Sequence, residues 1–146
     1  MSTRQPSEVL RDSIDALPAE LAQRIEVLPA DDARDLHARA TRAFTDGTAA
    51  SVRTDALVGD AQVTCEDSWK LIEDFDADGP VVLFTNHRDG QTMFELASIR
   101  DALAVVGALD RFDFYLVDRA CTFLFAFDEY DTLFGCGTAA PYVAKL

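Results

Sequence analysis

The stretch FDFYLVDRACTFLFAFDEYDTLFGCG, residues 112–137, contains six phenylalanines and predicts three consecutive β-strands. In FDFYLVD and TFLFAFD, residues at alternate positions share a face, and both faces are largely apolar. TLFGCG follows a turn at residues 129–131 and predicts the third strand. Strands with two apolar faces are typical of a sheet covered on both sides. We therefore expect an antiparallel meander at the centre of the core.

The segment before the meander predicts a hairpin and a helix. VVLFTN (81–86) has the composition of a short buried strand, and Asp89-Gly90 is a hairpin turn signal. QTMFEL (91–96) is interpreted as the return strand, with the start of a helix as the alternative. SIRDALAVVGAL (98–109) has a helical apolar face that would cover one side of the sheet.

The first 45 residues predict helices that begin at prolines. LPAELAQRI (17–25) and LPADDARDL (28–36) each place a proline at the expected first helical position, followed by acids. The second of these helices extends to about Gly47. Its apolar face consists of Ala33, Leu36, His37, Ala40 and Phe44. We expect the N-terminal helices to cover the other side of the sheet.

The predicted fold class is α+β, with N-terminal helices packed on a mainly antiparallel C-terminal sheet that carries one further helix. Residues 1–146 are expected to form a single domain with a helical part at 1–47 and an α+β part at 63–146. Residues 48–62 have small side chains and weak periodicity, and predict a linker or a loosely held turn of helix. TCEDSWKLIEDF (64–75) predicts another helix, with Thr64 and Asp67 as a capping box.

The charge is strongly acidic. The chain has 26 acids and 13 bases, a net charge of −13, with 19 Asp against 7 Glu and 11 Arg against 2 Lys. This composition resembles that of cytosolic proteins from salt-accumulating haloarchaea, where molar salt screens the repulsion between acids. The alternative is an acidic protein from a low-salt cell that mimics nucleic acid or binds a basic partner.

A cytoplasmic location is predicted, with no membrane partner. There is no run of about 18 apolar residues. The N-terminal residues lack the basic and apolar segments of a secretory signal peptide. The three cysteines, at positions 65, 121 and 136, are too few and too scattered for a disulfide framework.

Cysteine chemistry would need a base, and the chain has two histidines. His37 lies on the apolar face of a predicted helix, which is typical of a hydrogen-bonded core histidine. His87 lies in the predicted hairpin turn. FGCGTAAP (134–141) lacks the ending of a phosphate-binding loop, and no helix is expected after it. The cysteines are therefore interpreted as small reduced side chains of the core.

Asp118, Asp128, Glu129 and Asp131 stand at predicted strand ends, where convergent carboxylates would bind a hard cation. Acids are so abundant in this chain that solvated turn residues are the expected interpretation. We predict no catalytic residue, no metal ligand and no cofactor. The alternative is an enzyme that depends on a metal ion, or on His87 with a cysteine, and whose substrate is unknown.

Direct binding of nucleic acid is not expected. Arg34, Arg39 and Arg42 fall close together on one predicted helix, where a basic stripe would contact phosphates. Acids alternate with these arginines, which is typical of a solvated face with internal ion pairs.

The order of strand, helix and three strands over residues 81–137 resembles that of small α+β proteins among bacterial toxin-immunity and related families. This chain has FDEYD (127–131) where those proteins more often have histidines, and Thr122-Phe123 where they tend to have tryptophan. The resemblance implies a protein without catalytic activity that binds another protein. It transfers no site residues, and it does not include the N-terminal helices.

We predict that this protein binds a protein or ribonucleoprotein partner without catalysing a reaction. The alternatives are the enzyme described above and a homo-oligomer that buries a strand edge or an aromatic face. The expected contacts lie at the hairpin tip and at the turn before the last predicted strand, where an arginine and a tyrosine are residue types that often dominate interfaces. These contact residues are Asn86, His87, Arg88 and Asp89 at the tip, and Asp128, Glu129, Tyr130 and Asp131 at the turn.

Overall fold

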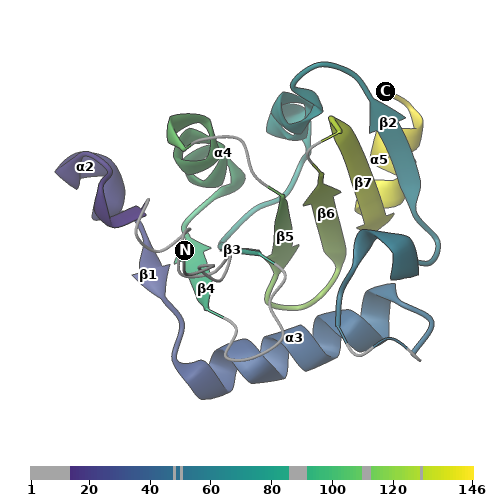
Figure 1. Ribbon diagram of the computed structural model, residues 1–146, viewed down its shortest axis with the longest axis horizontal. Helices are drawn as coiled ribbons and strands as arrows, with labels where there is room; N and C mark the ends of the chain where they lie inside the picture. The colour runs from purple at the N-terminus through teal and green to yellow at the C-terminus, as the bar shows by residue number, and fades with distance from the viewer. Residues whose placement is uncertain (1–13, 48, 50, 86–91, 110–112, 129) are drawn as a thin grey trace, which may run out of the picture.

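Seven antiparallel strands form one sheet in the order β1-β4-β3-β5-β6-β7-β2 (Figure 1). The computed structural model describes residues 14–47, 49, 51–85, 92–109, 113–128 and 130–146. The strands are β1 (Glu26–Val27), β2 (Ala61–Thr64), β3 (Val81–Phe84), β4 (Met93–Leu96), β5 (Phe114–Asp118), β6 (Phe123–Phe127) and β7 (Thr132–Gly137). The helices are α2 (Ala19–Ala22), α3 (Ala30–Phe44), α4 (Ile99–Ala108) and α5 (Ala139–Ala144), with 3-10 helices η1 (Thr54–Ala56) and η2 (Ser68–Asp74). The α+β prediction is therefore confirmed.

The predicted meander forms the centre of the sheet. In β5 and β6, Phe114 pairs with Phe127 and Leu116 with Phe125, so aromatic and aliphatic side chains meet across the strands. Every residue of β6 is buried. The hairpin of β3 and β4 is also present, and QTMFEL supplies the return strand rather than the start of a helix. Alternation of side chains predicted β5 and β6, while apolar composition and turn signals predicted β3, β4 and β7.

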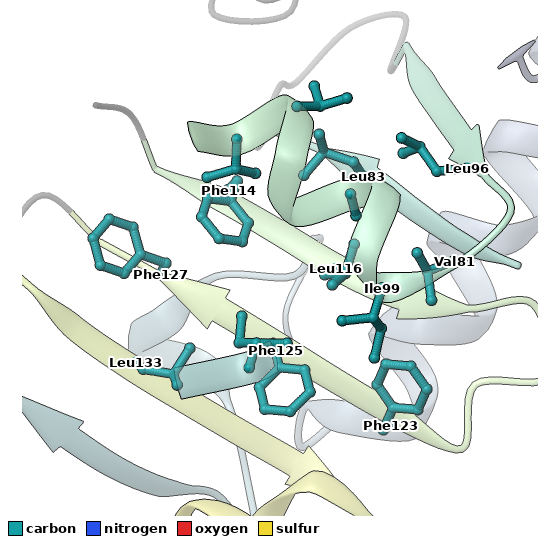
Figure 2. Close-up of a cluster of buried hydrophobic side chains, with 14 of the residues drawn as sticks. Val81, Leu83, Leu96, Ile99, Phe114, Leu116, Phe123, Phe125, Phe127 and Leu133 are labelled. Atoms are coloured by element: carbon teal, nitrogen blue, oxygen red, sulfur yellow. The ribbon is translucent and has the colours of Figure 1, made fainter. Parts of the chain in front are cut away.

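The two faces of the sheet carry separate cores. One core lies against α4, η2 and α5, and Figure 2 shows its side chains from β3, β5, β6, β7 and α4. The other core lies against α3, which contributes Ala33, Leu36, Ala40 and Phe44. The N-terminal helices do not all cover this second face. Ile14, Leu17 and Leu21 instead pack on the same core as α4.

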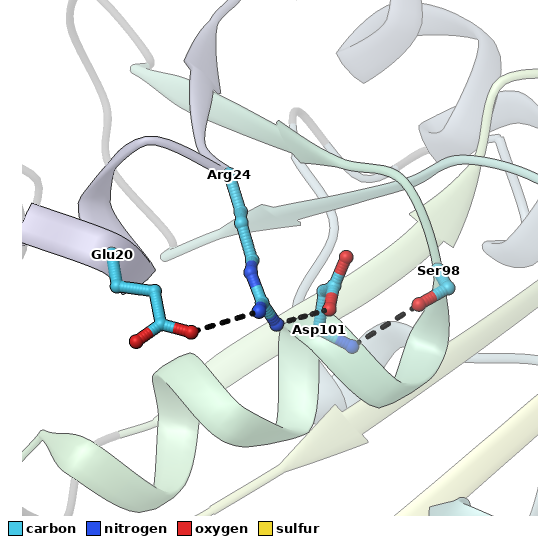
Figure 3. Close-up of polar contacts among 4 residues, drawn as sticks. All are labelled: Glu20, Arg24, Ser98 and Asp101. Atoms are coloured by element: carbon cyan, nitrogen blue, oxygen red, sulfur yellow. Dashed lines mark hydrogen bonds and ion pairs between the residues drawn. The ribbon is translucent and has the colours of Figure 1, made fainter.

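Helix α4 begins as predicted. The Ser98 side-chain oxygen accepts a hydrogen bond from the backbone N–H of Asp101 (3.2 Å), which caps the helix. The Asp101 carboxylate in turn accepts from Arg24 (3.1 Å), and Arg24 also contacts Glu20 at 3.5 Å (Figure 3). These contacts connect α2 to the start of α4.

The N-terminal third differs from its prediction. The segment 17–28 is not one helix, because α2 ends after four residues and β1 follows it. Pro18 and Pro29 occupy the N-cap positions of α2 and α3 with extended ψ angles, one residue before the predicted position. Helix α3 itself has the predicted apolar face and ends at Phe44.

Within residues 48–62, the structure has a turn of 3-10 helix at Thr54–Ala56, as one of the two alternatives expected. The segment is not a simple linker, because Val52 is fully buried and Ala61 and Gln62 begin β2. The predicted capping box is wrong. Thr64 ends β2, and Asp67 has a left-handed backbone (φ 54°) before the 3-10 helix η2. The helix α5 after FGCG was not predicted. Its Pro141 stands at the third helical position, where the backbone needs no N–H donor.

In the part of the chain that the structure describes, no helix combines the length and apolar composition needed to cross a bilayer.

Candidate partner-binding surface

The turn between β6 and β7 is held by its own aspartates. The Asp128 carboxylate oxygen Oδ1 accepts hydrogen bonds from the backbone N–H groups of Tyr130 (3.0 Å) and Thr132 (3.1 Å). The backbone N–H of Asp131 donates to the carbonyl oxygen of Asp128 (3.1 Å). Asp131 has a left-handed backbone (φ 62°), which aspartate tolerates better than most residues. These hydrogen bonds connect the described turn residues to one another and to Thr132.

The residues before η2 support this turn from outside. The Asp131 carbonyl oxygen accepts hydrogen bonds from the Cys65 N–H (3.2 Å) and the Ser68 hydroxyl (2.8 Å). The Asp131 carboxylate accepts from the Asp67 N–H (3.2 Å). Because Asp131 is bound through both its backbone and its side chain, the turn is attached to η2 as well as to the sheet.

Tyr130 projects from this supported turn into solvent. It is 75% exposed, the largest exposed fraction among the described large hydrophobic residues. An aromatic side chain on a rigid backbone loses little conformational entropy when it binds a partner, and tyrosine is enriched at the centres of interfaces.

A cavity of about 160 Å³ adjoins the turn. It lies between the end of α4, η2 and the strands β5 and β6. Gly107 borders it opposite the Trp69 ring, where a methyl group on the glycine would come within 3.3 Å of Trp69 Cη2. The lining residues are Asp67, Trp69, Val106, Gly107, Leu109, Phe114 and Phe127, and the rings of Phe114 and Phe127 stack with centroids 5.5 Å apart.

Two residues connect the cavity to the turn. Asp67 lines the cavity and donates its N–H to Asp131, and Phe127 lines the cavity and directly precedes Asp128. The cavity and the turn thus belong to the same end of the sheet. We name the described turn residues Asp128, Tyr130 and Asp131, together with this cavity, the Tyr130 surface.

The structure brings together three of the eight predicted contact residues: Asp128, Tyr130 and Asp131. The Asp128 carboxylate accepts from N–H groups of the turn and the Asp131 carboxylate accepts from the Asp67 N–H, so both carboxylates stabilise the turn as well as contributing charge. Glu129 and the tip residues 86–89 (Asn86, His87, Arg88 and Asp89) lie outside the described residues. Sequence reasoning missed the cavity, because its residues come from four segments that share no motif.

Among the described strand-end acids, Asp118 lies in a different turn from Asp128 and Asp131. Asp118 accepts hydrogen bonds from the N–H groups of Thr122 (2.8 Å) and Phe123 (3.3 Å) in the turn before β6, whereas Asp128 and Asp131 lie after β6. Among the described residues, no group of three or more His, Cys, Asp or Glu side chains is placed to hold a metal ion.

The cysteines differ in environment. Burial raises the pKa of the Cys136 thiol to about 12, and burial also raises the pKa of Cys121. Cys65 is exposed. Thiols with raised pKa values are poor nucleophiles, so the two cysteines of the opening stretch are suited to packing rather than to catalysis. His87 lies outside the described residues.

His37 differs from its prediction. Its Nε2 atom is buried and has no hydrogen-bond partner among the described residues, so the expected satisfied core histidine is wrong for this atom. The ring instead meets Phe84 edge to face, with centroids 6.2 Å apart. Burial lowers the pKa of His37 below its ordinary value of 6.5.

The arginines of α3 contact acids of the same helix. Arg39 donates to Asp35 at 2.9 Å, and Arg34 forms an ion pair with Asp31. Arg39 also donates to the carbonyl oxygen of Arg119 (2.6 Å). The internal ion pairs predicted for Arg34 and Arg39 are therefore present.

Comparison of this chain with protein-family models, curated proteins and solved structures found no match.

Proposed function

We propose that this protein is a non-catalytic binding protein whose Tyr130 surface captures a protein partner. The observation that carries the proposal is the exposure of Tyr130 on a turn fixed by hydrogen bonds of Asp128 and Asp131. An exposed tyrosine on a hydrogen-bonded turn is available for contact with a partner. The toxin-immunity resemblance of residues 81–137 also favours a protein partner.

The size of the adjoining cavity favours an inserted side chain over a small-molecule ligand. Ligand pockets usually enclose about 300–1,000 Å³, whereas this cavity measures about 160 Å³. Its lining is mainly apolar and aromatic. One apolar side chain of the partner would fill it, with Tyr130 packing beside it.

The charge of the surface favours protein over nucleic acid. Asp67, Asp128 and Asp131 surround the cavity and turn, and would repel phosphate groups. Where the partner is a ribonucleoprotein, the contact would be with its protein component. The Asp-rich and Lys-poor composition supports a cytoplasmic, archaeal and halophilic setting. Binding would then take place at high salt, where charge interactions are screened and apolar contacts contribute most of the affinity.

The test is capture of partners from host lysate at about 2–3 M KCl, a concentration at which charge repulsion is screened. We expect a stoichiometric partner on the wild-type protein and at least about tenfold weaker binding of that partner to Tyr130→Ala, with an unchanged melting temperature. Val27→Ala is the matched control, since Val27 is also exposed (51%) but lies on β1, outside this surface. Equal binding by Tyr130→Ala and the control would overturn the proposal.

Fluorescence of Trp69 provides a direct measurement on the purified pair. Trp69 is the only tryptophan in the chain and lines the cavity. Insertion of an apolar group there should shift its emission, and Gly107→Leu should fill the cavity and abolish the shift. A partner that binds with no change in Trp69 emission would place the contact elsewhere, for example at the hairpin tip, where Arg88→Ala would then weaken capture.

A further inference from the structure

The outer edge of β2 presents unpaired backbone groups. Cys65 donates its N–H to the Asp131 carbonyl, so Cys65 belongs to a hydrogen-bonded pair of the β2–β7 ladder. In an antiparallel ladder such pairs alternate with pairs whose N–H and C=O groups point away. Val63 and Ala61 therefore bond to β7, while Gln62 and Thr64 direct their N–H and C=O groups outward. Within the described residues, no strand lies beyond β2.

The two edges of the sheet differ in how they are protected. At the opposite edge, β1 has only two residues, one of them Glu26, and Pro29 follows closely. Short length, charge and proline are common devices that stop an edge strand from pairing with another chain. β2 has four residues, Ala-Gln-Val-Thr, with no charge and no proline, in a chain of which 27% is charged. The unprotected edge is thus confined to β2.

Apolar side chains flank this edge. Val58, three residues before β2, is 44% exposed, and Leu146, which follows α5, is 48% exposed. Helix α5 packs against β2, and Figure 1 shows the C-terminus beside that strand. Exposed apolar side chains thus lie near β2, where a paired chain could contact them.

We propose that two copies of this protein pair through β2 as antiparallel edge strands and form a continuous sheet. A second copy fits this edge because the strand is uncharged, and two chains of net charge −13 approach best along an uncharged strip. An acidic protein would also attract a basic peptide. β2 itself has no carboxylate with which such a peptide could pair.

The alternation of backbone groups restricts the register. Outward residues must face outward residues, which allows Gln62 to face Gln62 of the second copy or Thr64 of the second copy. The second register brings Asp60 opposite Glu66, two like charges, whereas the first brings Asp60 opposite Thr64. Gln62 therefore lies on the two-fold axis, and residues 60, 62 and 64 form the intermolecular ladder.

Light scattering at about 2–3 M KCl tests the dimer. The wild type should have twice the monomer mass of 16.0 kDa, and Gln62→Pro should have the monomer mass. Proline at this position removes an N–H that β7 does not use, so the fold and its circular dichroism should be retained. The matched control is Val27→Pro, which removes an outward N–H from β1 and should remain dimeric. A monomeric wild type, or a dimeric Gln62→Pro variant, would overturn the proposal.

Cross-linking tests the register. Hydrogen-bonded partners have Cα atoms about 5.5 Å apart, within the range of a disulfide. In a Cys65→Ser background, Gln62→Cys should form an intermolecular disulfide with oxidised glutathione, and Val27→Cys should not. Equal cross-linking of the two variants, or none for Gln62→Cys, would contradict pairing at β2. Tyr130→Ala should remain dimeric, so this result is independent of the function proposed above.

Discussion

Aspartate in this protein has a structural use at single residues, besides its contribution to net charge. Asp118 and Asp128 each accept two backbone N–H groups in the turns before and after β6. A carboxylate satisfies donors that a tight turn would otherwise leave without partners. An abundance of acids therefore does not mean that all of them lie free on the surface.

At the same scale, His37 gives a prediction about pH. Because burial lowers the pKa of folded His37 below 6.5, the unfolded chain takes up the proton first as pH falls. The effect of His37 should therefore leave the free energy of unfolding at its highest above pH 6.5 and decrease it progressively below that pH. Chemical denaturation at pH 7.5 and 5.5 measures the loss.

His37→Gln is the control, since glutamine does not titrate in this range. Its free energy of unfolding should depend less on pH between 7.5 and 5.5 than that of the wild type. Identical pH dependence in the two proteins would show that folding does not lower the pKa of His37.

At the scale of elements, the contact between α5 and β7 depends on Gly135. A methyl group at this position would lie 2.6 Å from Val143 Cγ2 and 2.7 Å from the carbonyl oxygen of Ala139. The helix rests directly on the strand backbone, so it cannot move away without uncovering the core beneath it. Gly135→Ala should therefore destabilise the protein by about 1–3 kcal/mol, measured by chemical denaturation.

Gly107→Ala is the matched control for that substitution. A methyl group at Gly107 would meet only the end of the Trp69 ring, at 3.3 Å, and alanine favours the helix α4. Its effect on the free energy of unfolding should be smaller. Equal destabilisation by the two substitutions would mean that α5 adapts to a side chain on β7.

The elements also show which patterns in a sequence predict structure. β5, β6 and α4 were predictable, because alternation or helical periodicity extends over their full length and Ser98 marks the start of α4. β1 and β2 were not, because they are two and four residues long and neither has a buried side chain. Such strands form only by pairing with strands that are distant in sequence, so local patterns do not predict them.

The candidate site shows the same division. The turn before β7 was predictable from the sequence, whereas the exposure of the Tyr130 side chain is known only from the structure. The cavity beside it required Trp69, Gly107 and Phe114 to meet, and these residues come from separate elements. Asp67 and Asp131 both adopt left-handed backbones, which the sequence alone does not indicate for aspartate.

At the scale of the whole molecule, charge repulsion opposes folding. Most of the ion pairs among the described residues are at exposed sites, such as Arg34–Asp31 and Arg53–Asp55, and pairs of this kind contribute little. We expect the melting temperature to rise by about 5 °C or more between about 0.1 M and 2 M KCl, because salt screens the net charge of −13.

Neutralising a group of exposed acids should reduce this dependence. Asp74, Asp76 and Asp78 are exposed and close in sequence. Their replacement by asparagine should raise the melting temperature at low salt and leave it nearly unchanged at high salt. A melting temperature that does not vary with KCl in the wild type would show that repulsion between acids does not limit the stability of the fold.

The strand order has a consequence for the order of events during synthesis. β1 and β2 leave the ribosome first, yet their partners are β4 and β7, and β7 ends at Gly137. β1, β2 and α3 therefore cannot reach their final contacts until most of the chain has been translated. In a nascent chain that stops before β7, the sheet would be incomplete and the apolar face of α3 would stay partly exposed. Exposed apolar surface of this kind is what chaperones bind, so we expect a chaperone to bind this chain until β7 has been translated.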